Sequence, residues 1–190
     1  MLILADNALR AIPSRIGELQ DLRTLDLGHN QLAELPVELG NLTEINDFLY
    51  LHDNRLESLP SSLERLKKLK YLNISHNRFS AFPESICHMS RLVELRATDN
   101  QFSDLPSSIA KLSRLRELHL RNNRLRTLPS AIAKLSELRL LDLRENPMEM
   151  LPESILEMPR LEKIDLRWAN MARELTWLDR LEDRGCLIYR

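Results

Sequence analysis

Residues 115–129 read LRELHLRNNRLRTLP, and this stretch contains the first part of the unit from which the chain is built. Leu118 and Leu120 stand on either side of a polar residue, and this short apolar alternation predicts a β-strand. Asn123 and Pro129 follow, and residues of these types are typical of the turn that leaves a strand. The stretch therefore predicts one strand followed by one turn.

The same pattern returns along the whole chain at intervals of 23 residues, except for one interval of 24. Its asparagines, which we call the asparagine ladder, are Asn7, Asn30, Asn54, Asn77, Asn100, Asn123 and Asn146. Six residues after each asparagine stands a proline: Pro13, Pro36, Pro60, Pro83, Pro106, Pro129 and Pro152. Self-similarity at this period predicts a solenoid, because one unit cannot bury its apolar side alone and must stack on its neighbours.

Apolar residues follow each proline at the third and sixth positions, as Ile109 and Leu112 follow Pro106. Proline is common at the first position of a helix, where its missing N–H has no helical partner to lose. An apolar residue at every third position suits a 3₁₀-helix. We therefore predict a short helical or 3₁₀ segment that begins at each proline.

The repeating pattern LxxLxLxxNxLxxLPxxIxxLxx resembles the leucine-rich repeat family over essentially all of the chain. It looks like the type found in Ras suppressor protein, Scribble-like scaffolds, plant intracellular Ras-group proteins and many bacterial repeat proteins. The resemblance implies an α/β fold, a right-handed solenoid or horseshoe. Its parallel β-sheet would line the concave face, with short helical or 3₁₀ segments on the convex face. It also implies that a protein partner binds on the concave face.

We expect residues 1–190 to form a single leucine-rich repeat domain with three parts. Residues 1–21 are a truncated first repeat, residues 22–166 are the regular repeats, and residues 167–190 are a C-terminal helical cap. The first repeat lacks the polar cap with which solenoids cover an apolar end. Of two explanations, we favour removal of upstream residues over cover by another chain.

A different pattern, MARELTWLDRLEDRG, follows the last repeat. Met171, Leu175, Leu178 and Leu181 share one face of a predicted helix, and Gly185 stands where a C-cap glycine belongs. The sequence CLIY then predicts one last short strand. We expect this segment to cover the apolar end of the final repeat rather than to act as a membrane or partner helix.

The longer interval adds one residue between Ile45 and Leu49, just before an expected strand. A residue added there can form a bulge that re-aims a side chain. Two interpretations remain: a tolerated loop insertion, or a bulge that directs Phe48 toward the concave face.

The composition favours a globular protein and argues against nucleic-acid binding. The 190 residues are 43 % hydrophobic, and the formal net charge of −1 lacks the basic excess of a nucleic-acid binder. The chain has no apolar run of about eighteen residues, so we expect no membrane association. Two lone cysteines, Cys87 and Cys186, fit a reducing compartment, and we expect a cytoplasmic location.

Residues at one strand position of a parallel sheet form a column, in which neighbours lie about 4.8 Å apart. The outward-facing columns place two groups on the expected concave face. The first is an aromatic patch, which consists of Phe48, Tyr50, His52 and Tyr71. The second is a polar cluster, which consists of Glu94, Arg96, Glu117, His119, Arg121 and Arg144.

Tyrosine and arginine side by side are typical of the centre of a protein interface. The predicted partner-binding site therefore consists of Phe48, Tyr50, His52, Tyr71, Asn73, Glu94, Arg96, His119, Arg121 and Arg144. Aromatic residues make up only 5 % of the chain, which argues against random scatter as the origin of the patch. The alternative interpretation is that the aromatic rings pack across strands and the charges neutralise one another within the sheet.

Directly before successive ladder asparagines stand Asp6, His29, Asp53, His76 and Asp99. Histidines that alternate with carboxylates suggest a transition-metal site. Each strand offers only one such residue in this column, however, so we interpret the column as an electrostatic ladder. We expect no metal and no cofactor.

The chain has no nucleophile elbow, no glycine-rich phosphate loop and no HExxH motif, so we expect no enzymatic activity. Cys87 and His88 are adjacent in sequence, and such neighbours do not face each other on a helix. We interpret Cys87 as a structural residue.

The sequence thus predicts a monomeric interaction module or signalling scaffold that binds a protein partner on its concave face. One alternative is the substrate-targeting repeat domain of a larger enzyme, such as a bacterial ubiquitin-ligase effector or a leucine-rich repeat kinase. Another is an assembly protein that forms homo-oligomers through its uncapped N-terminal end.

Overall fold

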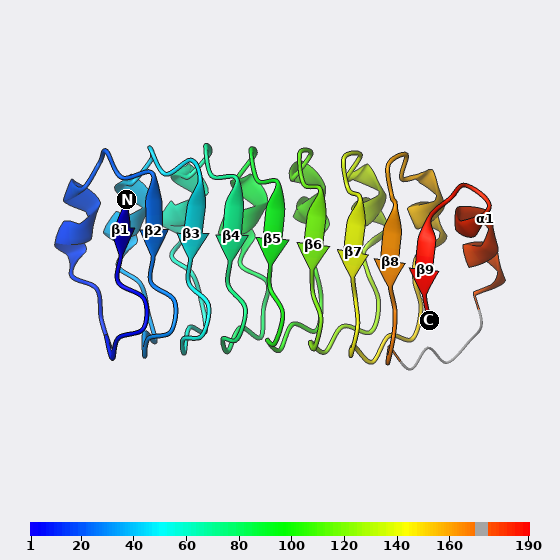
Figure 1. Ribbon diagram of the computed structural model, residues 1–190, viewed down its shortest axis with the longest axis horizontal. Coiled ribbons are helices and arrows are strands. Elements are labelled where there is room, and N and C mark those ends of the chain that lie inside the picture. Colours follow the sequence, from blue (N-terminus) through cyan, green and yellow to red (C-terminus); the bar gives the residue numbers. More distant parts are fainter. Residues whose placement is uncertain (170–174) are drawn as a thin grey trace.

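The structure, a computed structural model, describes residues 1–169 and 175–190 as a row of similar coils (Figure 1). Its strands are β1 (Leu2–Ile3), β2 (Thr24–Asp26), β3 (Phe48–Tyr50), β4 (Tyr71–Asn73), β5 (Glu94–Arg96), β6 (Glu117–His119), β7 (Leu140–Asp142), β8 (Lys163–Asp165) and β9 (Leu187–Tyr189). In the described residues these strands form one sheet in chain order, and every neighbouring pair is parallel. The predicted parallel sheet is therefore confirmed.

The register of the sheet confirms the predicted columns. Leu49 at the centre of β3 pairs with Leu25 on one side and with Leu72 on the other, and all three are fully buried. The residues on either side of each central leucine also pair with their counterparts, as Tyr50 pairs with Asn73. Because successive side chains of a strand point to opposite faces, these flanking residues line the outer surface of the sheet.

A 3₁₀-helix follows each turn, as predicted: η1 (Ser14–Glu18), η2 (Val37–Asn41), η3 (Ser61–Arg65), η4 (Glu84–His88), η5 (Ser107–Lys111), η6 (Ser130–Lys134) and η7 (Glu153–Glu157). The expected start at the proline is wrong by one residue. Pro60, for example, lies just before η3 with an extended backbone, φ −62° and ψ 140°. Its carbonyl accepts the first helical hydrogen bond, from the Leu63 N–H at 3.1 Å, so the proline is the N-cap.

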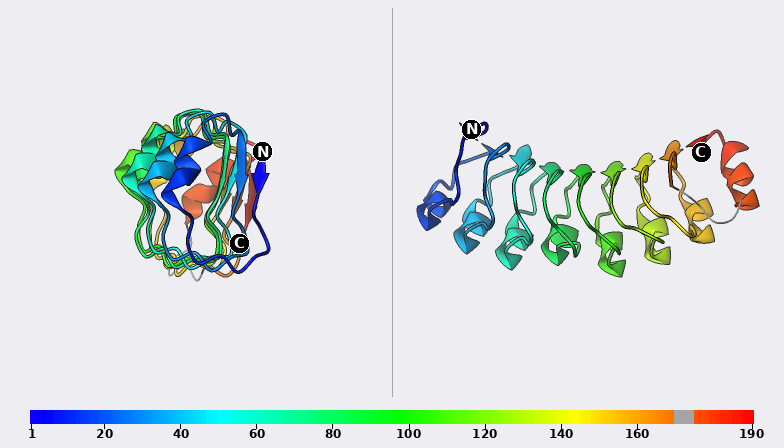
Figure 2. Two further views of the ribbon diagram at one scale, coloured as in Figure 1. Left: turned by 90° about the vertical axis from the view of Figure 1, so that its left-hand side faces the viewer. Right: turned by 90° about the horizontal axis from the view of Figure 1, so that it is seen from below.

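The row of coils is bent, with the strands on the inner side and the 3₁₀-helices on the outer side (Figure 2). Neighbouring strands approach to about 4.8 Å, whereas helices with their side chains need more room. The stack therefore curves toward the sheet, and the sheet becomes the concave face of the predicted horseshoe.

The core lies between the sheet and the 3₁₀-helices and consists mainly of leucine. Phe79 and Phe102 occupy leucine positions in neighbouring repeats; both are fully buried, and their rings stack with centroids 6.1 Å apart. Ala97 replaces a leucine of the repeat and is also fully buried. The core is therefore continuous through the irregular repeats.

The asparagine ladder holds the backbone of neighbouring repeats together. The Nδ2 group of Asn77 donates to the carbonyls of Leu51, Ile74 and Ser75 at 2.9, 3.2 and 3.1 Å. Its Oδ1 accepts from the Leu56 N–H at 2.9 Å. The same set of contacts recurs at Asn30, Asn54, Asn100, Asn123 and Asn146. Each side chain thus satisfies buried backbone groups that the turn leaves without a partner.

The extra residue of the long interval is accommodated before β3. The N–H groups of Asn46 and Asp47 both donate to the Arg23 carbonyl, at 3.2 and 3.3 Å, and Phe48 then pairs with Thr24 in the ordinary register. Phe48 therefore reaches the concave face through the same column as Tyr71, and no bulge re-aims it. Of the two interpretations, the structure agrees with the tolerated insertion.

The C-terminal segment covers the last repeat, and Leu175, which was predicted to lie within the helix, instead directly precedes it. Met171 lies outside the described residues, and the helical part consists of η8 (Thr176–Leu178) and α1 (Asp179–Glu182). Leu178 and Leu181 are buried, as predicted. Gly185 ends the helix with φ +86°: its N–H donates to Glu182, and the next N–H donates to Leu181, the pattern of a Schellman cap.

The predicted last strand is confirmed as β9, which pairs with β8. None of the described helices has the length and hydrophobicity needed to cross a membrane.

Candidate protein-binding face

The four residues of the aromatic patch form one contiguous cluster on β3, β4 and the turn after β3. The ring centroids of Phe48, Tyr50 and Tyr71 lie 5.8, 5.4 and 5.1 Å apart in the three pairs, and His52 lies 5.8 Å from Tyr50. Rings at these separations attract each other beyond the simple burial of area. The patch is therefore a single apolar surface that rests on the sheet.

The aromatic patch remains accessible from solvent. The Phe48 side chain is 43 % exposed, and Tyr50 and Tyr71 are half-buried. Burial raises the pKa of Tyr71 to about 12 and also raises the pKa of Tyr50. Both hydroxyl groups are therefore neutral hydrogen-bond donors over the physiological pH range.

The charges of the polar cluster are paired, as the alternative interpretation expected. The Arg96 Nε atom donates to Glu94 at 2.6 Å, and the Arg96 guanidinium lies over the Tyr71 ring, 6.0 Å from its centroid. The other pairs are His119 with Glu117 at 3.1 Å, Arg121 with Glu145 at 2.8 Å and Arg144 with Asp142 at 2.7 Å. The face beside the aromatic patch is therefore polar and almost neutral.

A depression of 340 Å³ lies beside the aromatic patch, across the carboxyl ends of β3 to β7. Its lining includes six predicted site residues: His52, Asn73, Arg96, His119, Arg121 and Arg144. The lining does not include the other four, which are Phe48, Tyr50, Tyr71 and Glu94. The predicted site therefore divides into an apolar patch and a polar depression, and His52 belongs to both.

Asn73 also has a structural role that the sequence analysis did not predict. Its Oδ1 atom accepts a hydrogen bond from the Ser75 N–H at 3.0 Å, and Asp26 accepts one from the Gly28 N–H at 2.9 Å in the same way. Side chains of this type mimic a backbone turn at the end of a strand. The polar side chains at this strand position, at the end of β2 and β4, are therefore partly a requirement of the fold.

Two buried carboxylates at the C-terminal end of the face were missed by the sequence analysis. Asp142 and Asp165 retain only 6 and 3 % of their side-chain exposure, and each accepts two hydrogen bonds from the guanidinium of the arginine two residues later. The repeated motif Asp-Leu-Arg, which ends at Arg144 and Arg167, is the sequence signal that could have found them.

The Asp165 carboxylate makes stability depend on pH. Burial alone would raise the pKa of Asp165, but the hydrogen bonds and the charge of Arg167 outweigh burial and hold the pKa below its usual value. A lowered folded pKa gives stability that is present above the unfolded pKa, which is about 3.9, and is lost as pH falls through the folded pKa.

We therefore expect the Asp165→Asn substitution to lower the unfolding free energy at pH 7, and we expect this difference from the wild type to shrink below about pH 4. Urea unfolding of both proteins across this pH range is the measurement. The exposed Asp21 provides the matched control, and Asp21→Asn should leave the pH dependence unchanged. If the difference in unfolding free energy between Asp165→Asn and the wild type stayed constant with pH, the pKa of Asp165 would not be lowered in the folded protein.

The backbone conformation accounts for the residue types in the column of histidines and carboxylates before the ladder asparagines. Its members have left-handed φ angles: Asp6 56°, His29 50°, Asp53 52°, His76 53° and Asp99 52°. Aspartate, asparagine and histidine tolerate this conformation better than most residues. Two ion pairs across neighbouring strands are also present, His29 with Asp53 at 3.7 Å and His76 with Asp99 at 3.3 Å. The structure thus places an imidazole beside a carboxylate in these two pairs, and the electrostatic ladder stays a prediction.

His52 approaches this column from the neighbouring one. Its imidazole ring lies against Gly28 of the preceding repeat, where an added Cβ atom would come within 2.5 Å of the ring. The ring meets His29 edge-on, with centroids 4.9 Å apart. Burial lowers the pKa of His52, so the ring is neutral at pH 7. The sequence columns give only the strand position of each residue, so they could not predict that the His52 ring lies beside His29 and Asp53.

The fold is shared with solved structures of repeat proteins. The leucine-rich repeat protein LIC12759 of Leptospira interrogans is 30 % identical, with a TM-score of 0.78 over 95 % of this chain. The complex PEPR1-AtPEP1 is 24 % identical, with a TM-score of 0.76 over 87 % of this chain. This chain spans 52 and 24 % of the lengths of those two chains. No curated protein gives a significant match.

Family models agree with the structural comparison. The models described as leucine rich repeat match residues 47–102, 91–148, 113–171 and 21–42, which together include more than half of the chain. The repeat period, the parallel sheet on the inner side and these matches lead to one conclusion: the chain belongs to the leucine-rich repeat family.

Proposed function

We propose that the protein is an interaction module that binds a protein partner on its concave face, with the aromatic patch at the centre of the contact. The observation that carries this proposal is the joining of an accessible apolar patch to a polar depression on one surface of the sheet. Aromatic residues beside arginine dominate the binding energy of many interfaces.

The arrangement favours a partner segment that combines an apolar anchor with polar groups. The half-buried tyrosines offer a large, rigid apolar area with a hydroxyl donor at the tip. The paired charges of the depression can exchange partners with charged groups of either sign. Leucine-rich repeat folds typically act in binding rather than in catalysis, and the proposal follows this pattern.

We propose that the protein binds its partner in the cytoplasm, which is a reducing environment. Cys87 and Cys186 are both buried free thiols, and burial raises the pKa of the Cys87 thiol to about 11. A thiol with so high a pKa is inert as a nucleophile at neutral pH. This supports a structural role for Cys87.

We expect Tyr50→Ala and Tyr71→Ala each to weaken partner binding by about 2 kcal/mol, or about thirtyfold in Kd. The physical reason is that each change removes apolar contact area from the centre of the interface. The probe is a peptide selected on the wild-type protein from a displayed random library, and calorimetry measures its binding to each variant.

The control variants lie on the convex side, at the exposed residues Glu84, Lys111 and Lys134. Alanine at each of these positions should leave the Kd within error of the wild type. If the convex substitutions abolished binding and the tyrosine substitutions did not, the partner would bind on the convex side and the proposed binding face would be wrong.

A further inference from the structure

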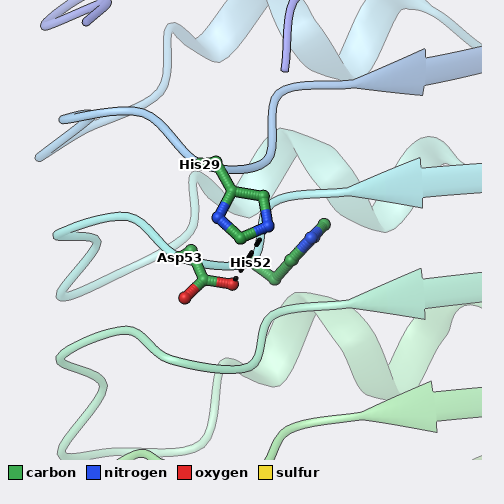
Figure 3. Close-up of side chains that lie close together, drawn as sticks. All are labelled: His29, His52 and Asp53. Atoms are coloured by element: carbon green, nitrogen blue, oxygen red, sulfur yellow. Dashed lines mark ion pairs between the residues drawn. The ribbon is translucent and has the colours of Figure 1, made fainter. Parts of the chain in front are cut away.

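Three side chains with metal-ligating atoms converge at the edge of the concave face, where β2 and β3 end (Figure 3). They are His29, from the turn after β2, and His52 and Asp53, from the turn after β3. One ligating atom from each of the three lies within 4.8 Å of the other two. The structure therefore brings together two imidazoles and one carboxylate from two neighbouring repeats.

The separation of one pair of ligand atoms is close to that in a zinc site. Two ligand atoms on one tetrahedral zinc ion, each about 2.1 Å from the metal, lie about 3.4 Å apart. The Nε2 atom of His29 and the Oδ2 atom of Asp53 lie 3.7 Å apart. The left-handed backbone at His29 and Asp53 directs both residues to the same edge, and a ligating atom of His52 lies within 4.8 Å of both.

His52 provides a second, independent observation. Its Nδ1 atom is buried and has no hydrogen-bond partner among the described residues. A buried polar atom without a partner costs free energy, and it calls for an explanation such as an ion or a water molecule. The ring is held in this place because Gly28 leaves space for it, with no Cβ atom to displace it toward solvent.

The other clusters of the described face are less suited to a cation. Glu94, Glu117 and His119 also place ligating atoms within 4.8 Å of one another, but Glu94 already accepts a 2.6 Å hydrogen bond from Arg96. The positive guanidinium would repel a divalent ion at that place. The cluster at His29 has no such hydrogen bond from arginine or lysine among the described residues.

The chain also contains an internal comparison. Two repeats further along, His76 and Asp99 form the same pair at 3.3 Å. The residue equivalent to His52 is there Thr98, and the residue equivalent to Gly28 is Ser75. The second pair thus has the same backbone and the same two groups but lacks the third ligand.

We propose that His29, His52 and Asp53 bind one divalent transition-metal ion, with Zn²⁺ as the reference case. Neutral imidazole and carboxylate ligands suit Zn²⁺, Cu²⁺ and Ni²⁺, whereas Mg²⁺ and Ca²⁺ prefer oxygen ligands alone. Three protein ligands leave a fourth position of the ion open to water. The site goes beyond the proposed binding function, although His52 also contacts Tyr50 of the aromatic patch.

The test is calorimetric titration of the whole chain with zinc chloride, with magnesium chloride as the control ion. We expect one Zn²⁺ per chain and no heat of binding for Mg²⁺. His52→Thr and Asp53→Asn should each weaken Zn²⁺ binding by about tenfold or more. Loss of a group that only hydrogen-bonds to a ligand already lowers metal affinity by about that factor, and loss of the ligand itself should lower it further. Threonine is chosen because the equivalent repeat carries Thr98 in the same backbone.

The matched control is His76→Ala, which should leave Zn²⁺ binding unchanged. Ser75→Gly combined with Thr98→His should build a second site at His76 and Asp99 and raise the stoichiometry to two. Circular dichroism establishes that each variant is folded. Absence of Zn²⁺ binding by the wild type, an equal loss with His76→Ala, or a stoichiometry that stays at one in the double variant would overturn the proposal.

Discussion

Phe102→Ala is expected to lower the free energy of unfolding by about 4 kcal/mol. Phe102 is fully buried, and its ring contacts two others, Phe79 at 6.1 Å and Phe82 at 5.5 Å between centroids. Removing the ring loses the transfer free energy of its apolar atoms and leaves a cavity that the stacked repeats can only partly close. Urea unfolding followed by circular dichroism measures the loss.

The matched control is Phe48→Ala, which makes the same chemical change on the concave face. Phe48 is 43 % exposed, and its ring contacts Tyr50 of its own strand and Tyr71 of the next strand, so its removal should cost about 1 kcal/mol or less. The same variant should weaken partner binding if the aromatic patch is the contact surface. Equal losses of stability at the two phenylalanines would contradict the placement of the core.

Asn77→Ala is expected to lower the free energy of unfolding by about 3 kcal/mol. Asn77 is 9 % exposed and makes four hydrogen bonds to backbone groups of its own repeat and the preceding one. Alanine would leave buried carbonyls and one buried N–H without partners, and each such group costs about 1–3 kcal/mol unless water reaches it. The measurement is again denaturant unfolding.

Asn41 provides the comparison for this substitution. It lies exposed at the end of η2, where its Oδ1 atom accepts one hydrogen bond from Arg65 at 3.1 Å. Asn41→Ala should cost about 0.5 kcal/mol or less, as is usual for surface substitutions. If Asn77→Ala were as mild as Asn41→Ala, the asparagine ladder would not support the backbone in the way that we infer.

The sequence by itself determined the repeating strand, and its resemblance to leucine-rich repeat proteins implied the parallel sheet, from which the register and the columns follow. A strand of three residues with a buried leucine at its centre has only one register in which every leucine faces the core. For this reason the outward-facing columns could be assigned from sequence alone, and the pairing of Tyr50, Asn73, Arg96 and His119 in neighbouring strands agrees with one such column. The 3₁₀-helices were predicted from the same period.

Tertiary structure alone decided how side chains of different columns meet. Long side chains reach across columns: Arg121 pairs with Glu145 of the next repeat, and His52 crosses to the space above Gly28. These contacts depend on rotamers and on the absence of a neighbouring Cβ atom, which no periodicity encodes. Periodicity therefore predicts where each residue is attached, whereas packing determines which groups form a site.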